Sequence, residues 1–197
     1  MKDINFLISG VGGQGVILAS DAMGEIGMDN GYDVKKSDSI GMAQRGGSVV
    51  SHMRWGKRVF SPMIKKGDAQ YLLGFEQLEA ARWASYLEPG GIAIIADASI
   101  IPASVIGGTV PYPTHNEIRE MIAGYTNNIY FIPATKICAE AGNPKALNMV
   151  MLGALSAFLE LDDAAWIENV RRRVPEKFID SSLEAFTRGA AAIKAGK

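Results

Sequence analysis

Apolar positions at the start of the chain follow the pattern of a buried strand and then that of a helix. Residues 4–9 form a short apolar run, and residues 16–31 carry apolar positions at helical spacing. A glycine-rich stretch at residues 10–15 separates the two segments. The pattern therefore predicts a strand, a tight loop and a helix, in that order.

Strand-like and helix-like segments alternate along the rest of the chain. Apolar or β-rich runs predict strands at residues 32–36, 48–55, 69–75, 92–96 and 128–132. Helical spacing predicts helices at residues 76–87, 134–141, 146–161, 163–173 and 177–195. The run at residues 92–96 is apolar on both faces, which is typical of a strand inside a parallel sheet that helices cover on both sides.

This alternation predicts an α/β fold. We expect a single domain over residues 1–197, with a mostly parallel sheet flanked by helices and a Rossmann-like start. No linker, low-complexity segment or repeat divides the chain. Residues 37–66 are long and glycine-rich, so we expect an irregular insertion after the second strand. Function tends to reside in such ordered insertions.

The composition excludes several classes of partner. The 197 residues carry a formal net charge of −1 at pH 7, so no strong field attracts nucleic acid or an anionic membrane. No apolar run reaches the roughly 20 residues that a membrane-spanning helix needs. The first residues lack the basic segment and apolar stretch of a secretory signal. We expect a cytoplasmic protein that binds neither nucleic acid nor membrane.

Cysteine and histidine are too scarce to build a metal centre. Cys138 is the only cysteine, and the two histidines, His52 and His115, lie far apart in the sequence. An iron-sulfur cluster or a structural zinc ion needs about four such ligands. We therefore expect any electron-carrying metal to belong to a partner chain, and we expect Cys138 to be a buried small hydrophobe.

The glycine loop fits the G-x-G-x-x-G pattern in its required place between a strand and a helix. Its residues are Gly10, Gly12, Gly13, Gln14 and Gly15, with Val11 between the first two glycines. Such a loop brings backbone N–H groups at a helix N-terminus close to an anion. A tight turn that only packs strand against helix has the same pattern, so ligand binding and packing are both open.

A dinucleotide site would need one more residue. An acidic side chain about 20 positions beyond the loop should reach the ribose. Asp33 and Asp38 are within range, but Asp33 lies inside the predicted second strand and Asp38 could instead cap a turn. The dinucleotide interpretation is open and not favoured.

A second glycine-rich segment holds one cation among hydrogen-bonding groups. Its candidate ligand-binding or anion-binding residues are Met42, Gln44, Arg45, Gly46, Gly47 and Ser48. The planar fork of an arginine suits a phosphate or carboxylate, and flanking glycines leave room for that group to approach. The alternative is an arginine whose stem covers the domain's own surface.

His52 and Asn148 are further candidates for a cleft. Alternation along residues 48–55 places His52 on the same strand face as Arg54, where the pair could bind an anion. A structural hydrogen-bonding role is the favoured interpretation, because no carboxylate that would orient the ring is near in sequence. Asn148 lies in a helix apolar nearly all round and is expected to tie that helix to a loop or to face a ligand.

Five segments together resemble one family. They are residues 10–16 (GVGGQGV), 41–49 (GMAQRGGSV), 51–54 (SHMR), 132–135 (IPAT) and 148–153 (NMVMLG). They resemble the gamma-type subunit of 2-oxoacid:ferredoxin oxidoreductases, and within that family they are most similar to the beta subunit of indolepyruvate oxidoreductase. The glycine loop alone is unspecific, but with Met-Ala-Gln-Arg-Gly-Gly at this spacing it is a strong signature.

The resemblance implies one subunit of a larger enzyme. The holoenzyme would oxidatively decarboxylate aryl 2-oxoacids such as indolepyruvate, using coenzyme A and passing electrons to ferredoxin. Thiamine diphosphate and iron-sulfur clusters would be on the large partner subunit. The present chain would bind no cofactor alone, would be inactive alone and would supply no catalytic residue, although a contact with coenzyme A is compatible with the resemblance.

Two other hypotheses are carried alongside it. One is a free-standing NAD(P)- or flavin-binding Rossmann-like protein, which the glycine loop suggests. The other is a purely structural scaffold subunit whose glycine loops only pack. An isolated subunit with an uncovered apolar patch could also form a homodimer.

Overall fold

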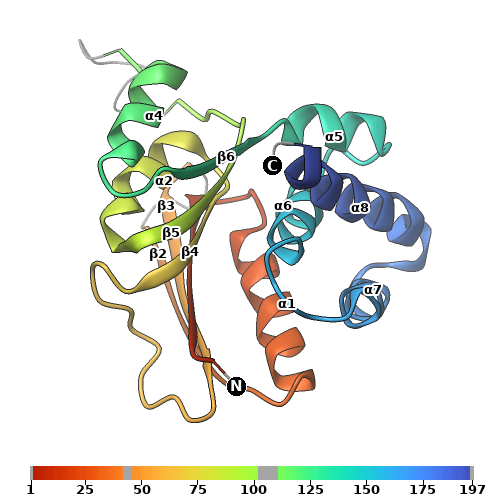
Figure 1. Cartoon of the computed structure of the whole chain (residues 1–197). Helices are drawn as coiled ribbons and strands as arrows, with labels where there is room; N and C mark the ends of the chain where they lie inside the picture. Colours follow the sequence, from red (N-terminus) through yellow and green to blue (C-terminus); the bar gives the residue numbers. More distant parts are fainter. Residues whose placement is uncertain (1, 42–45, 102–110, 196–197) are drawn as a thin grey trace.

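A six-stranded sheet forms the centre of the protein (Figure 1). The computed structural model describes residues 2–41, 46–101 and 111–195. The strand order across the sheet is β2-β3-β1-β4-β5-β6. The strands are β1 (Ile4–Val11), β2 (Asp33–Ile40), β3 (Ser48–Gly56), β4 (Ala69–Gly74), β5 (Leu87–Ala96) and β6 (Asn128–Ile132).

Most of the sheet is parallel. β1, β4, β5 and β6 run in one direction, and β3 is antiparallel both to β1 and to the edge strand β2. The predicted α/β fold with a mostly parallel sheet and a strand–glycine loop–helix start is confirmed.

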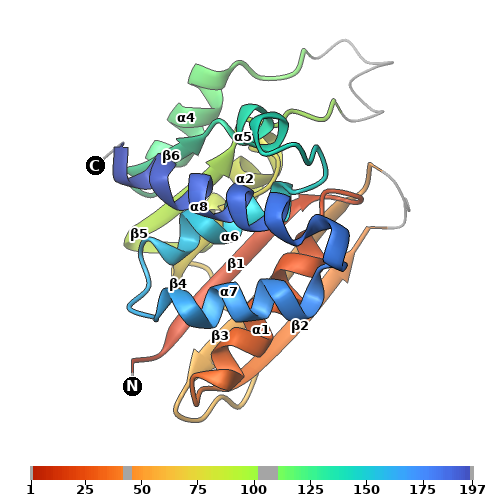
Figure 2. The same ribbon diagram turned by 90° about the vertical axis from the view of Figure 1, so that its right-hand side faces the viewer.

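Helices cover both faces of the sheet. On one face lie α1 (Val16–Asp29), α5 (Ala134–Glu140), α6 (Leu147–Ser156), α7 (Asp163–Arg173) and α8 (Ile179–Ala195). Figure 2 shows α1, α6, α7 and α8 in front of the sheet. On the other face lie α2 (Gln77–Trp83), which continues into a 3-10 turn over Ala84–Tyr86, and α4 (His115–Ala123).

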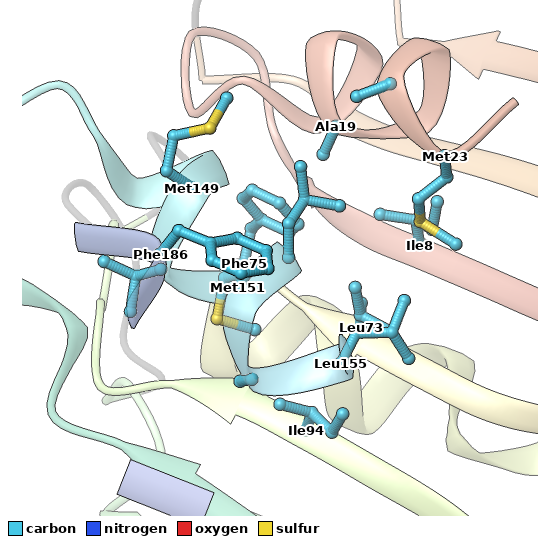
Figure 3. Packing of buried hydrophobic residues seen from close by; sticks show 14 of the residues in the cluster. Ile8, Ala19, Met23, Leu73, Phe75, Ile94, Met149, Met151, Leu155 and Phe186 are labelled. Atoms are coloured by element: carbon cyan, nitrogen blue, oxygen red, sulfur yellow. The ribbon is translucent and has the colours of Figure 1, made fainter. Parts of the chain in front are cut away.

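Alternation along the strands sorts the core into two clusters. Phe6 and Ile8 of β1 belong to the cluster between the sheet and helices α1 and α6. Figure 3 shows Ile8 there, near Leu73 of β4. Leu7 points to the opposite face and packs under α2 and α4, where Ile118 is also fully buried. Strands with apolar residues on both faces are what a sheet covered on both sides requires.

α6 and α8 cross at two glycines. A Cβ atom on Gly153 would lie 1.9 Å from the carbonyl oxygen of Phe186. A Cβ atom on Gly189 would lie 2.1 Å from the carbonyl oxygen of Val150. Each glycine therefore leaves space for the backbone of the other helix, which brings the two helices into close contact.

The second strand is longer than predicted. β2 continues to Ile40 and forms a hairpin with β3, so residues 37–66 are less irregular than predicted. α6 ends at Ser156, where the pattern predicted a helix to residue 161. α4 was not predicted, although Thr114 and Glu117 form a capping box at its start that marks a helix N-terminus in sequence.

Cys138 is buried in α5 at 4% exposure, as predicted, and burial raises the pKa of its thiol. Within the described residues, no helix combines the length and apolar character needed to cross a membrane.

Candidate functional site

The two glycine segments lie at the carboxyl edge of the parallel strands. β1 and β4 are neighbours, but β1 leads into α1 on one face of the sheet and β4 leads into α2 on the other. Helices that leave adjacent strands in opposite directions open a crevice at the strand ends, and α/β proteins bind ligands there. The predicted glycine loop occupies this switch point.

Steric crowding and backbone conformation explain several glycines of the first loop. A Cβ atom on Gly10 would lie 2.7 Å from the Cβ of Phe75, just after β4. Gly13 and Gly15 have φ angles of +100° and +86°, which other residues rarely adopt. Gly15 is the N-cap of α1, and its α-carbon faces Asn148 of α6. The loop therefore joins β1, β4, α1 and α6.

Gln14 closes this loop against the end of β4. Its Oε1 accepts a hydrogen bond from the backbone N–H of Val11 at 2.8 Å, and its Nε2 donates to the carbonyl oxygen of Phe75 at 2.8 Å. The side chain that the sequence suggested as a ligand-binding group is therefore engaged inside the protein.

The second glycine segment lies against the first. The N–H of Gly12 donates to the carbonyl oxygen of Gly47 at 2.9 Å, and the N–H of Gly41 donates to the carbonyl oxygen of Ser48 at 2.8 Å. Met42, Gln44 and Arg45 fall outside the described residues, but the residues on both sides of them are fixed at the carboxyl edge. The structure thus brings together two segments that the sequence could only note separately.

Two buried carboxylates at this edge were missed by the sequence reasoning. Glu79 of α2 is 3% exposed, and it accepts hydrogen bonds from the hydroxyl of Ser48 at 2.5 Å and from Arg82 Nη1 at 2.6 Å. Glu79 therefore connects α2 to the base of the second glycine segment.

Glu76 is the second buried carboxylate, at 1% exposure. It accepts from the N–H of Glu79 at 2.8 Å, which caps α2, from the N–H of Ile100 at 3.3 Å and from the hydroxyl of Tyr112. Burial and the bond to Glu76 raise the pKa of Tyr112 to about 12. A carboxylate directly after an apolar strand, three residues before another, was the available sequence signal.

His52 is enclosed and lies away from the glycine loop. It is 3% exposed, its Nδ1 accepts a hydrogen bond from the N–H of Ile64 at 3.2 Å, and Trp83 and Tyr86 pack edge-on against the ring. Burial lowers the pKa of the imidazole below its ordinary value of 6.5. These contacts favour the structural role.

Asn148 is at the other side of the glycine loop. It is 9% exposed, and its Oδ1 accepts from the N–H of Met149 at 3.0 Å. It also lines a cavity of about 630 Å³ that lies between α1, α6, α7 and α8. Asn148 therefore contacts both the glycine loop and an opening in the surface.

The two acidic residues considered for a ribose contact are poorly placed. β3 lies between β2 and β1, so both carboxylates of β2 are two strands away from the glycine loop. Asp33 pairs with Lys35 and accepts from the N–H of Val59, and Asp38 pairs with Lys36 Nζ at 3.0 Å. The geometry does not support a dinucleotide fingerprint.

Across residues 2–41, 46–101 and 111–195, no group of three or more acidic, histidine or cysteine side chains is arranged to hold a metal ion.

Comparisons with known proteins place the chain in a family of oxidoreductases. The family model "Pyruvate ferredoxin/flavodoxin oxidoreductase" matches residues 5–192. The chain is 36% identical to the indolepyruvate oxidoreductase subunit IorB of Thermococcus kodakarensis in an alignment of 197 positions that covers 98% of each chain.

Two solved structures share the fold. The gamma subunit of a keto/oxoacid ferredoxin oxidoreductase from Geobacter sulfurreducens PCA has a TM-score of 0.74 and 23% identity, with 99% of this chain and 98% of that one covered. A 2-oxoglutarate:ferredoxin oxidoreductase from Magnetococcus marinus, solved with 2-oxoglutarate, coenzyme A and succinyl-CoA, has a TM-score of 0.74 and 21% identity. There the match covers 99% of this chain but 32% of the longer one.

These matches confirm the resemblance predicted from the motifs, and the relatives are subunits of oxidoreductases. A family model that spans nearly the whole chain, and a relative of matching length at 36% identity, show that the chain belongs to the pyruvate ferredoxin/flavodoxin oxidoreductase family.

Proposed function

We propose that the chain is the small, metal-free subunit of a 2-oxoacid:ferredoxin oxidoreductase of the indolepyruvate type. The observation that carries the proposal is the match to an indolepyruvate oxidoreductase subunit over 98% of both chains. The match covers nearly the full length of that relative, rather than one module of it. The substrates are accordingly aryl 2-oxoacids.

The reaction requires cofactors that a second chain must supply. A 2-oxoacid and coenzyme A give an acyl-CoA, carbon dioxide, a proton and two electrons, which reduce ferredoxin. Thiamine diphosphate provides the carbanion chemistry of the decarboxylation, and iron-sulfur clusters carry the electrons. With one cysteine, this chain cannot hold a four-thiolate cluster, so the clusters are assigned to the large subunit. The family resemblance assigns thiamine diphosphate to the same subunit.

The role of this chain centres on the carboxyl edge. Backbone N–H groups at the start of α1 and the guanidinium of Arg45 are suited to an anion. Two anions take part in the reaction, the carboxylate of the oxoacid and the phosphates of coenzyme A. The hydrogen bond from Gly12 to Gly47 supports a single shared site, since it joins the two segments at one point.

A scaffold role for the same loops is the second candidate. The side-chain oxygen and nitrogen of Gln14 both form hydrogen bonds with backbone groups of the protein, as expected if the loop only packs strand against helix. A free-standing dinucleotide-binding protein is disfavoured, because β3 separates both carboxylates of β2 from the loop.

Co-expression with the thiamine-dependent large subunit tests the subunit assignment. We expect the two chains to co-purify, and ferredoxin-linked oxidation of indolepyruvate to require both. Full activity of the large subunit without this chain, or no association, would contradict the assignment. Stoichiometric binding of NAD(P) or flavin to the isolated chain would favour the free-standing alternative.

Arg45→Ala distinguishes an anion site from a scaffold in the assembled enzyme. A charged hydrogen bond contributes about 1.5–3 kcal/mol, so we expect the KM for coenzyme A or for indolepyruvate to rise roughly 10- to 100-fold. A higher KM for coenzyme A would indicate that Arg45 binds its phosphates, and a higher KM for indolepyruvate would indicate that it binds the carboxylate. Arg171→Ala, at an exposed position of α7, is the matched control and should leave both KM values unchanged. Intact assembly with unchanged KM values in Arg45→Ala would support the scaffold.

A further inference from the structure

A long loop between β3 and β4 presents apolar side chains to solvent. The loop lies at the end of the sheet where β1 begins, and the glycine loops lie at the opposite end (Figure 1). Phe60 is 83% exposed, the largest value among the exposed large hydrophobic side chains of the described residues, and Met63 is 54% exposed. Exposed apolar groups of this size mark interaction sites when they cluster.

The loop is held rigidly by its other residues. Val59 and Ile64, next to the two exposed residues, are buried at 7% and 5% exposure. The N–H of Val59 donates to Asp33 Oδ2 at 2.8 Å, and the N–H of Ile64 donates to His52 Nδ1 at 3.2 Å. Phe60 and Met63 are therefore presented to solvent by a fixed backbone, which reduces the entropy that binding would cost.

Arg54 adds a further link from the sheet to the loop. Its Nη1 donates to the carbonyl oxygen of Ser61 at 3.2 Å, and its Nε donates to Asn5 Oδ1 at 2.9 Å. The turn between the buried residues Val59 and Ile64 is thus fixed from β3 as well as from its two ends.

The loop is also strongly basic. Residues 57–66 contain four basic residues, Lys57, Arg58, Lys65 and Lys66, and no acidic residue. Acidic residues near the loop include Asp3 beside Gly56 and Asp68 at the loop's end. Asp33 pairs with Lys35, accepts from the N–H of Val59 and also attracts Arg58. The guanidinium of Arg58 lies 4.9 Å from the ring centre of Phe60. Phe60 therefore has a cation beside its ring, and the exposed Lys57 precedes Arg58 in the loop, in a chain whose net charge is −1.

We propose that residues 57–66 form a docking loop for the large subunit of the oxidoreductase, where Phe60 and Met63 enter an apolar pocket with an acidic rim. The inference rests on the proposed function. Aromatic and arginine side chains at the centre of an interface contribute most of its binding energy. A complementary acidic rim steers association and fixes the orientation.

A large subunit explains the loop better than a second copy of this chain. A two-fold contact through the loop would bring the basic residues of both copies together, and like charges at an interface repel. In the Magnetococcus marinus enzyme the matching region is 32% of one longer chain, so there the same fold is joined to its neighbours covalently.

Phe60→Ala tests the docking loop, with Phe178→Ala as its matched control. Phe178 is 44% exposed in the 3-10 turn over Glu176–Phe178 that precedes α8, and Lys177 Nζ lies 4.9 Å from its ring centre, so a cation lies beside the ring as in Phe60. We expect the Kd for the purified large subunit, measured by titration calorimetry, to rise roughly 10- to 100-fold in Phe60→Ala. In Phe178→Ala the Kd should stay within about twofold of the wild type.

A charge-reversal variant tests the rim separately. Lys57→Glu combined with Arg58→Glu should slow association and weaken its dependence on salt concentration, as measured by stopped-flow mixing. An association rate and salt dependence equal to those of the wild type would overturn the proposed acidic rim.

The outcomes separate the docking loop from the proposed function. If the wild-type chain fails to bind the large subunit, the proposed function is wrong. If the wild type binds and Phe60→Ala binds equally well, the docking loop alone is wrong.

Phe60-dependent binding to vesicles of phosphatidylcholine with about one third phosphatidylserine would overturn the loop's assignment to a protein partner. Unchanged circular dichroism of Phe60→Ala is expected, since the side chain is 83% exposed.

Discussion

At the scale of single residues, burial controls the charge of His52. The ring is almost fully enclosed, and its Nδ1 accepts a backbone hydrogen bond, which only the neutral imidazole can do from that nitrogen. Enclosure by Trp83 and Tyr86 removes the water that would stabilise the cation. The same loop backbone that presents Phe60 therefore depends on His52 remaining neutral.

We predict that acid destabilises the fold through His52. Because burial lowers its pKa in the folded chain below 6.5, the unfolded chain binds protons first as the pH falls. The contribution to stability is complete above pH 6.5 and is lost progressively below it. Urea unfolding between pH 8 and 5 should show this fall, and His52→Gln should reduce its slope. An equal slope in both proteins would contradict the prediction.

At the scale of helices, the contact between α6 and α8 depends on two glycines. Each glycine faces a backbone carbonyl of the other helix at a distance that no side-chain carbon tolerates. Because both neighbours are backbone atoms, a rotamer change cannot relieve the overlap. The two helices would have to move apart, and the core residues that they cover would lose contacts.

Gly153→Ala should therefore destabilise the protein by about 3 kcal/mol or more, measured by urea denaturation with circular dichroism. Gly189→Ala should behave alike. Gly124→Ala is the control, since a Cβ atom there would meet only Met121 O at 3.7 Å and the backbone is in the ordinary helical region. We expect that control to be neutral or slightly stabilising. A loss below about 1 kcal/mol at Gly153 would contradict the close contact.

At the scale of the whole molecule, one sheet is shared by two hydrophobic clusters. Adjacent residues of β1 lie in opposite clusters, so each strand is covered by helices on both faces. If the helices left one face, the apolar residues of the same strands would be exposed there and the sheet that supports the other face would be destabilised. We propose on this basis that residues 1–197 form one cooperative domain. Small single domains of this kind usually unfold in one step.

The three tryptophans make this prediction testable without substitutions. Trp55 and Trp166 lie in the cluster beneath α1 and α7, and Trp83 lies on the other face, at the end of α2. We expect their three indole N–H signals in NMR spectra to disappear at the same urea concentration. An earlier loss of the Trp83 signal would show that the α2–α4 layer unfolds separately.

Local patterns in the sequence were sufficient for much of the fold. The start of the chain, the strands at residues 69–75, 92–96 and 128–132 and the helix at residues 163–173 follow from apolar periodicity, which depends on near neighbours. The family signature was also local, because its five segments could be recognised one by one. The ends of helices were predicted less well, because packing against other elements decides at which residue a helix ends.

Tertiary structure alone decided how the candidate site is assembled. No local pattern places β3 between β2 and β1, joins Gly12 to Gly47, or buries Glu79 against Ser48. Gln14 looked like a ligand-binding residue until its two partners on the backbone were known. Strand order and buried polar pairs arise from contacts between residues distant in sequence, and periodicity carries no information about which distant partner a residue will meet. The sequence by itself determined most of the elements and the family, whereas the long-range packing determined the site.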